Sequence, residues 1–204
     1  MIKTFVEPPL DNNNYVVTDG DEAVLIDCSA PDSAILDYIR DQGAKLKYIL
    51  LTHGHFDHIL GLPFIAEQAG VSVAVHPADR PLIRDISRWT EQILNQKTET
   101  IPVADTDLAD GMHLKVGASD IQVLYTPGHT PGGVCFLIGK NLFSGDTMFR
   151  GTHGRTDLPG SDDQVMQASL GKLLQLPDDT IIYPGHGPAT TIGAEKKTYH
   201  ADKT

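Results

Sequence analysis

One short run of the chain, residues 52–58 (THGHFDH), constrains its fold more than any other feature. The run directly follows the apolar segment Tyr48–Leu51 and holds four side chains of the kinds that bind metal ions: His53, His55, Asp57 and His58. Imidazoles and a carboxylate at the end of a buried strand are costly to desolvate unless a cation or a hydrogen bond satisfies them. The run therefore predicts a metal site at the end of a strand.

The spacing of these four side chains predicts how they divide between two metal ions. Residues two apart in an extended segment point to the same side, so we expect His53, His55 and Asp57 to line one face. His58 breaks this alternation and is expected to point into a second, adjacent site. One segment could thus serve two ions, and the alternative is a histidine-rich surface loop with incidental spacing.

Three later segments repeat the pattern of an apolar strand that runs out into glycine or proline beside a potential ligand. They are Leu124–Gly133 with His129, Leu142–Thr147 with Asp146, and Ile181–Pro188 with His186. Short, stiff turns at strand ends are the kind of support that a preorganised site requires. A lone histidine or aspartate at one such place would be structural, but four instances together predict a shared centre.

These motifs resemble the metallo-β-lactamase-fold hydrolases, and most closely the short bacterial proteins similar to glyoxalase II, the hydroxyacylglutathione hydrolases. The resemblance runs from Asn14 to about Pro188. Its motifs follow the family's order: His-x-His-x-Asp-His, an isolated histidine, an aspartate and a final histidine. The resemblance implies an α+β fold in which two sheets lie between helical layers, an αββα sandwich.

The resemblance also implies a role for each candidate residue. One metal ion would be held by His53, His55 and His129 and the other by Asp57, His58 and His186, with Asp146 bridging both. Asp57 and Asp146 would act in catalysis through the ions that they hold. Asp27 matches a family aspartate that orients a ligand histidine, a contact that fixes the imidazole tautomer.

Such a centre implies hydrolytic chemistry. Two divalent cations that share a water lower its pKa toward neutrality and supply hydroxide to attack a carbonyl group. A thioester suits this chemistry because a thiolate leaves without strong help from a general acid. The imidazole and carboxylate ligands most readily accept zinc, and they also accept iron or manganese.

The predicted substrate is a small thioester, and S-lactoylglutathione, a 2-hydroxyacyl thioester, is the leading example. Arg155 matches the place where proteins similar to glyoxalase II hold a glutathione carboxylate, a role that suits a guanidinium. The alternative is a structural pair between Arg155 and Asp157. Two departures from the long enzymes weigh against glutathione, since Gly187-Pro188 follows His186 and the sequence ends at Thr204.

Other activities remain in competition. Persulfide dioxygenases share the Gly154–Asp157 loop and use one iron, held by residues equivalent to His53, His129 and Asp146. A metal-binding module without activity is disfavoured by an open, hydroxide-generating site. Lactonase activity ranks lower, as does β-lactamase activity, because zinc β-lactamases commonly use a cysteine ligand that is missing here.

The length, composition and charge of the chain limit which folds, partners and compartments are compatible with these predictions. A chain of 204 residues with 40% hydrophobic content predicts a single domain over residues 1–204, without an added C-terminal helical domain. A net charge of −11 argues against a nucleic-acid partner.

No stretch approaches the ~20 apolar residues of a membrane span, and the N-terminus lacks a secretory apolar core. The two cysteines, Cys28 and Cys135, are predicted to be buried free thiols, which fits the cytoplasm. The oligomeric state is not predicted.

Hydrophobic periodicity and turn residues predict the order of the elements. The expected strands are Asn14–Thr18, Ala23–Asp27, Tyr48–Thr52, Ser72–His76, Ile121–Tyr125, Val134–Ile138 and Thr180–Tyr183. The expected helices are Ser33–Gln42, Leu60–Ala69, Asp79–Asn95 broken by Pro81, and Asp162–Leu174.

Overall fold

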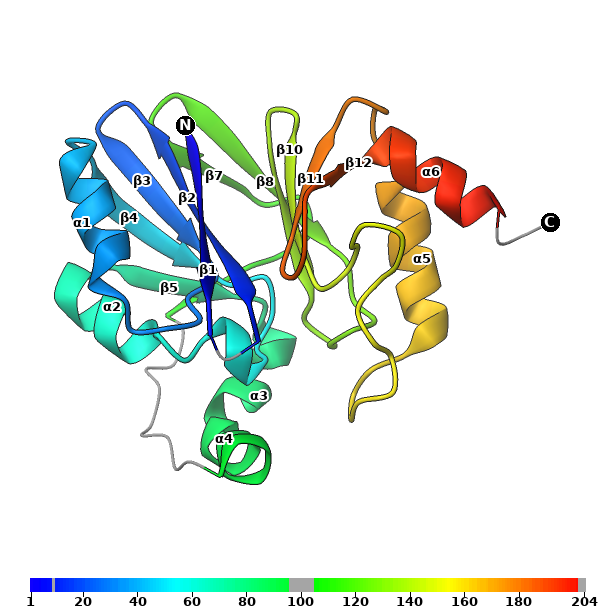
Figure 1. The fold of residues 1–204 in the computed structure, drawn as a ribbon, viewed down its shortest axis with the longest axis horizontal. Helices are drawn as coiled ribbons and strands as arrows, with labels where there is room; N and C mark the ends of the chain where they lie inside the picture. The colour runs from blue at the N-terminus through cyan, green and yellow to red at the C-terminus, as the bar shows by residue number, and fades with distance from the viewer. Residues whose placement is uncertain (9, 96–104, 202–204) are drawn as a thin grey trace.

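Two mixed sheets of six strands pack face to face in the computed structural model, which describes residues 1–8, 10–95 and 105–201 (Figure 1). The first sheet contains, in spatial order, β1 (Ile2–Glu7), β2 (Asn12–Asp19), β3 (Glu22–Ile26), β4 (Lys45–Leu50), β5 (Ser72–Val75) and β6 (Thr106–Asp107). The second contains, in spatial order, β12 (Thr190–Thr191), β11 (Ile181–Pro184), β10 (Asn141–Gly145), β9 (Val134–Ile138), β8 (Ser119–Tyr125) and β7 (His113–Val116).

Helices cover the outer face of each sheet, with α1 and α2 on one side of the molecule and α5 and α6 on the other (Figure 1). Their bounds are α1 (Ser33–Asp41), α2 (Leu62–Ala69), α5 (Asp163–Leu173) and α6 (Ile192–Ala201). Two further helices, α3 (Arg80–Arg84) and α4 (Ile86–Leu94), follow β5, and short 3-10 turns lie at η1 (Phe56–His58) and η2 (Pro77–Asp79).

Alternation along the strands produces three apolar layers. In β3, Leu25 packs with the helix residues of α1 and α2, whereas Ile26 packs between the sheets. In β9, Phe136 packs between the sheets and Cys135 packs toward α5. Strands that are buried on both faces carry runs of apolar residues, as β3 does after Glu22 and β9 does along its length. The αββα sandwich implied by the resemblance is confirmed.

All seven predicted strands are present, with small shifts at their ends, and so are the helices α1, α2 and α5. The predicted helix Asp79–Asn95 is wrong in one respect, because Pro81 does not break it. Pro81 lies in the first turn of α3, where its missing N–H is not needed, and the break falls at Asp85 instead. The expected strands did not include β1, β6, β7 or β12.

Cys28 and Cys135 are buried free thiols, as predicted. Burial raises the pKa of the Cys135 thiol to about 11, so this side chain does not offer a thiolate at neutral pH. Among the helices that the structure describes, none is both long and apolar enough to cross a membrane.

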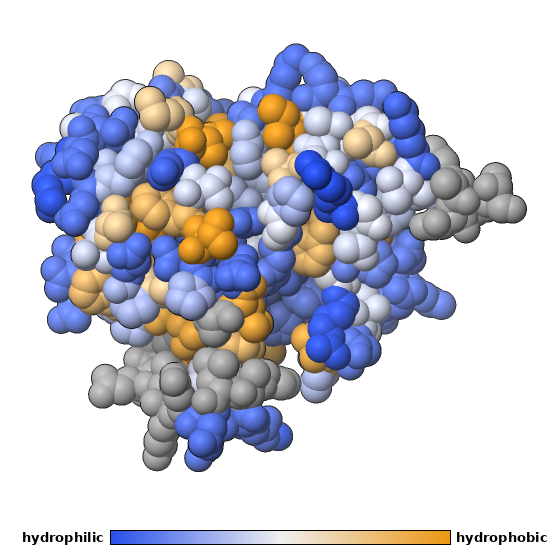
Figure 2. Space-filling view, in the orientation of Figure 1, coloured by the Kyte–Doolittle hydropathy of each residue, from blue (hydrophilic) through white to orange (hydrophobic). Residues whose placement is uncertain are grey.

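Figure 2 shows hydrophilic residues over α1 and apolar patches near the centre of the same face. Val6 in β1 and Leu10 just beyond it are among the large apolar side chains that remain exposed. β1 pairs with β2 alone in the sheet order, so it forms one edge of the first sheet.

Candidate metal centre

The ligand-bearing run does not continue strand β4. This strand ends at Leu50, and residues 56–58 form the 3-10 turn η1, in which the N–H of His58 donates to the carbonyl oxygen of His55 at 3.1 Å. The expectation that His53, His55 and Asp57 line one face of a strand is therefore wrong. A 3-10 turn advances about 120° per residue rather than 180°, so Asp57 lies with His58 and not with His55.

All seven predicted ligand residues converge on one place between the two sheets. Their ligand atoms form three groups, and within each group the atoms lie no more than 4.8 Å apart. The groups are His53, His55 and His129; Asp57, His58 and His186; and His53, His58 and Asp146. The first two groups match the two metal positions implied by the resemblance, and the third lies across them.

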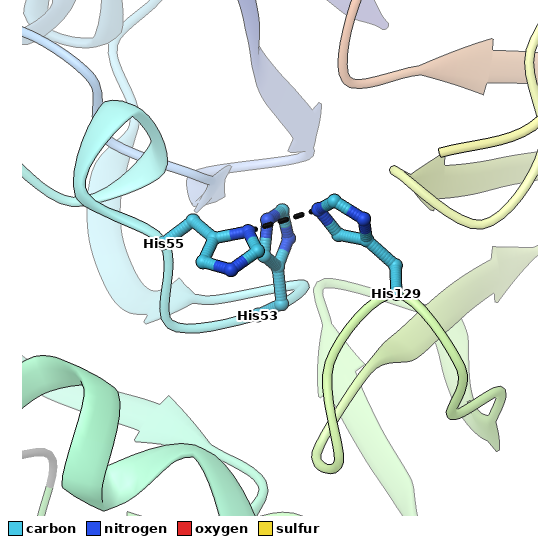
Figure 3. A group of neighbouring side chains, drawn as sticks. All are labelled: His53, His55 and His129. Carbon is cyan, nitrogen blue, oxygen red and sulfur yellow. Dashed lines mark hydrogen bonds between the residues drawn. The ribbon is translucent and has the colours of Figure 1, made fainter. Parts of the chain in front are cut away.

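The first group shows how the two sheets contribute to the centre (Figure 3). His53 and His55 come from the loop after β4, and His129 approaches from the loop between β8 and β9. Nδ1 of His55 lies 2.9 Å from Nε2 of His129. Three imidazole nitrogens that point toward a common centre form a donor set that suits zinc or iron.

Asp146, which follows β10, lies between the groups. Its Oδ1 is 3.4 Å from Nε2 of His58, and its Oδ2 is 3.5 Å from Nε2 of His129. The same Oδ2 is 3.7 Å from Nε2 of His186, which itself lies 3.2 Å from Oδ2 of Asp57. One carboxylate therefore faces ligands of both groups.

Two orphaned polar atoms show that the residues fit a cation. Nε2 of His53 and Oδ1 of Asp146 are buried, and neither has a hydrogen-bond partner among the described residues. A buried polar atom without a partner costs about 1–3 kcal/mol, so such atoms are rare unless something binds them. Both atoms face the other ligand atoms, where a metal ion would satisfy them.

Electrostatics divide the histidines into two kinds. Burial and the neighbouring His58 hold the pKa of His53 well below its usual value. Burial likewise lowers the pKa of His55 to about 3, and the nearby His129 adds to the effect. Both imidazoles are therefore neutral at physiological pH, which is the state that binds a metal.

In the second group, neighbouring carboxylates raise the pKa of both histidines. Burial opposes protonation of His58, but the carboxylates of Asp146 and Asp27 outweigh it and raise its pKa well above the usual value. The pKa of His186 is also raised, against burial, by its contact with Asp57. These imidazoles must lose their protons before they can bind a cation. Metal affinity is therefore expected to fall as the pH is lowered.

The structure places Asp27 against His58, as the resemblance implies. Oδ2 of Asp27 accepts from Nδ1 of His58 at 2.8 Å and from the Thr52 hydroxyl at 2.8 Å. Its Oδ1 accepts from the N–H of Thr52 at 2.8 Å. Asp27 itself has a φ of +59°, an uncommon value for a residue other than glycine. The contact turns Nε2 of His58 toward the centre, 3.4 Å from Oδ1 of Asp146.

Asp79 is a supporting residue that the sequence did not reveal. It is fully buried, and its carboxylate accepts from the N–H of Gly54 at 2.9 Å, the hydroxyl of Thr130 at 2.7 Å and the N–H of Gly132 at 2.6 Å. The first contact holds the loop of His53, and the others hold the loop of His129. Asp79 thus connects two ligand loops that are far apart in the sequence.

A cavity of about 460 Å³ opens beside the centre. Besides metal-ligand candidates, its lining residues are Leu10, Phe56, Phe149, Gly154, Arg155 and Leu158. Most of these side chains are apolar, so the part of a substrate next to the centre would meet apolar walls. Leu10 and Leu158 were not predicted, since they belong to loops without a motif of their own. Phe56 lies within the run 52–58, but it is not a metal ligand and was given no role.

Arg155 lines this cavity, and it also forms the ion pair weighed as the alternative. Its Nε donates to Oδ1 of Asp157 at 2.6 Å and its Nη2 donates to Oδ2 of Asp157 at 2.7 Å. Its carbonyl oxygen accepts from Nδ1 of His129 at 2.8 Å. A Cβ on Gly154 would lie 2.0 Å from the carbonyl oxygen of Asp146, so only glycine allows this approach. The loop therefore orients the ligand histidine His129, and it places the positively charged guanidinium of Arg155 at the cavity wall.

Known proteins are similar to this chain over most of its length. The family model of the metallo-β-lactamase superfamily matches residues 8–186. Hydroxyacylglutathione hydrolase GloC of Haemophilus influenzae is 33% identical over 197 residues, which cover 92% of this chain and 90% of that protein.

Two crystal structures are similar over nearly their full lengths. That of the BLEG-1 B3 metallo-β-lactamase has a TM-score of 0.89 at 35% identity and covers 97% of both chains. That of TTHA1623 in a di-iron-bound form has a TM-score of 0.87 at 38% identity and covers 96% of this chain and 98% of that one. By its motifs, its fold and these matches, the chain belongs to the metallo-β-lactamase superfamily.

Proposed function

We propose that this protein is a dinuclear metal-dependent thioesterase that hydrolyses small 2-hydroxyacyl thioesters such as S-lactoylglutathione. The observation that carries the proposal is the pair of ligand groups that share Asp146 at the end of an apolar-walled cavity. Similarity to GloC, whose name describes a hydroxyacylglutathione hydrolase, favours this substrate class.

The proposed cofactor is a pair of divalent metal ions, and zinc is the leading candidate. When bound, such ions ionise water and polarise a carbonyl group. Imidazole and carboxylate donors also suit iron or manganese, and TTHA1623 has been crystallised with two irons. The protein's part is to hold the donors: Asp27 and the Arg155 carbonyl fix two imidazole tautomers, and Asp79 connects two of the ligand loops.

The direct test is metal analysis together with a thioester assay. We expect the purified protein to contain two ions per chain and to release thiol from S-lactoylglutathione. Prolonged dialysis against a chelator should abolish thiol release, and adding back the correct metal should restore it. Metal-replete protein that releases no thiol from any hydroxyacyl thioester would refute the proposal. A β-lactam belongs in the same assay, because BLEG-1 is described as a B3 metallo-β-lactamase.

Arg155 is proposed to anchor a carboxylate of the substrate. Replacing Arg155 with alanine should raise KM for S-lactoylglutathione about ten-fold, the effect of losing a charged hydrogen bond worth about 1.5 kcal/mol. The value of kcat should change less, because the guanidinium contacts a part of the substrate that does not react. Steady-state kinetics of the variant measure both constants.

Asp157 offers a matched control for this prediction, because it competes with a substrate carboxylate for the same guanidinium. The pair is exposed and therefore weak, so Asp157→Asn should leave KM unchanged or slightly lower. A fall in kcat alone in Arg155→Ala would show that Arg155 does not anchor the substrate.

A persulfide dioxygenase is the second candidate, and the loop Gly154–Asp157 favours it. In the structure this loop bonds directly to His129, one of the three residues that would hold a single iron. Metal content and oxygen consumption distinguish the dioxygenase from the thioesterase. The dioxygenase would contain one iron per chain and consume oxygen with a persulfide, whereas the thioesterase would do neither.

A further inference from the structure

Asn12 lies within the metal centre without a role in the ligand set. It is the first residue of β2, and its side chain is fully buried. Its Nδ2 lies 2.7 Å from Nε2 of His58, closer than any carboxylate oxygen lies to that nitrogen. Its Oδ1 is buried and has no hydrogen-bond partner within the part of the chain that the structure describes. The amide is therefore held in place by His58.

The nitrogen that Asn12 contacts is the one that a metal ion needs. Nδ1 of His58 is engaged by Asp27 at 2.8 Å, so a neutral His58 carries its proton there and has a lone pair on Nε2. This lone pair accepts from the Asn12 amide. If His58 is protonated, the amide can rotate and accept from Nε2–H through Oδ1, since its two ends have nearly the same shape.

The backbone around Asn12 is fixed, so only its side chain can yield. Asn12 pairs with His186 in an isolated bridge, and the N–H of Asn13 donates to the carbonyl oxygen of Gly185 at 2.7 Å. Two residues further on, Oδ1 of Asn14 accepts from the N–H of Ser29 at 2.8 Å. These contacts fix the backbone of Asn12, so the amide lies within reach of His58.

We propose that the Asn12 amide competes with a metal ion for Nε2 of His58, which makes the position of Asp57, His58 and His186 the weaker of the two. No comparable amide contact involves the ligand nitrogens of His53, His55 or His129 among the described residues. The first ion therefore binds at the three-histidine position, and the second binds only at the expense of a hydrogen bond.

Equilibrium metal binding tests this competition. Metal-stripped protein is titrated with Co²⁺ or Zn²⁺ against a chromophoric chelator, which yields a dissociation constant for each ion. In Asn12→Ala, the constant for the second ion should fall about five-fold, which corresponds to about 1 kcal/mol for one hydrogen bond. The constant for the first ion should stay within about two-fold. Asn12→Leu should behave in the same way while excluding a water that could replace the amide in the alanine variant.

Asn13→Ala is the matched control. The Asn13 amide donates to the carbonyl oxygens of Pro184 at 3.0 Å and Gly187 at 2.8 Å, and it holds the loop of His186 without contacting His58. This variant should not bind the second ion more tightly. A second-ion constant that is unchanged or higher in both Asn12 variants would overturn the competition, because the amide would then be neutral or assist the ion. The titration measures metal alone, so its outcome is independent of thioester hydrolysis.

Discussion

Replacing Asp146 with alanine is expected to abolish thioester hydrolysis, with a loss in kcat/KM of about a thousand-fold or more. Its two carboxylate oxygens face His58 on one side and His129 and His186 on the other, so no other single side chain serves both ligand groups so directly. Without the Asp146 carboxylate, a buried cluster of imidazoles loses a negative charge, so the variant should bind less metal. Steady-state kinetics and elemental analysis of the variant measure these effects.

Two further variants make this result specific. Asp146→Asn keeps the shape but removes the charge, and it should reduce metal content nearly as much as alanine does. Asp179→Ala removes an exposed carboxylate that pairs with Lys140, and it should leave both metal content and activity unchanged. Full activity with two bound ions in Asp146→Ala would show that Asp146 does not bridge them.

Replacing Gly185 with alanine is expected to disable the second ligand group by steric conflict. A Cβ at this position would lie 2.3 Å from Oδ1 of Asp146 and 2.8 Å from Cε1 of His58, both far inside van der Waals contact. The backbone cannot retreat easily, because Gly185 donates to the Gly145 carbonyl and accepts from Asn13. We expect one of the two ions to be lost and kcat/KM to fall about a hundred-fold, the loss of roughly 3 kcal/mol of stabilisation.

Gly171 provides the control for this substitution. It lies inside α5, and a Cβ there would meet nothing within 4 Å. Gly171→Ala should therefore retain activity and two ions, and it should raise stability by about 1 kcal/mol through helix propensity. Two ions and normal kinetics in Gly185→Ala would mean that the loop around His186 can move outward at little cost.

The seven ligand candidates could be predicted because each stands where an apolar strand runs out into a tight turn. His129 and His186 are flanked by proline and glycine, and Asp146 follows a glycine. The strands between them were also predictable, since buried strands carry unbroken apolar runs. The division of ligands by strand alternation failed because no periodic signal marks a turn as short as η1.

The supporting residues were harder to predict, since their partners lie far away in the sequence. Asp79 reaches Thr130, and Asn12 reaches His58, yet neither residue differs locally from an ordinary aspartate at a helix start or an ordinary strand asparagine. The sequence did contain one signal, because three consecutive asparagines begin β2 and precede its apolar residues Tyr15, Val16 and Val17. Buried amides of this kind need partners, so such a run is worth examining in similar chains.

The donors of the centre come from both sheets: one half of the chain provides His53, His55, Asp57 and His58, and the other provides His129, Asp146 and His186. Apart from these loops, the halves meet mainly across the middle apolar layer. An ion bound by donors from both sheets therefore links the two halves of the chain. A metal-ion concentration of about one hundred times the dissociation constant would add about 2.7 kcal/mol to the free energy of unfolding. A cell short of metal would then hold a looser protein as well as an inactive one, and proteases could remove it first.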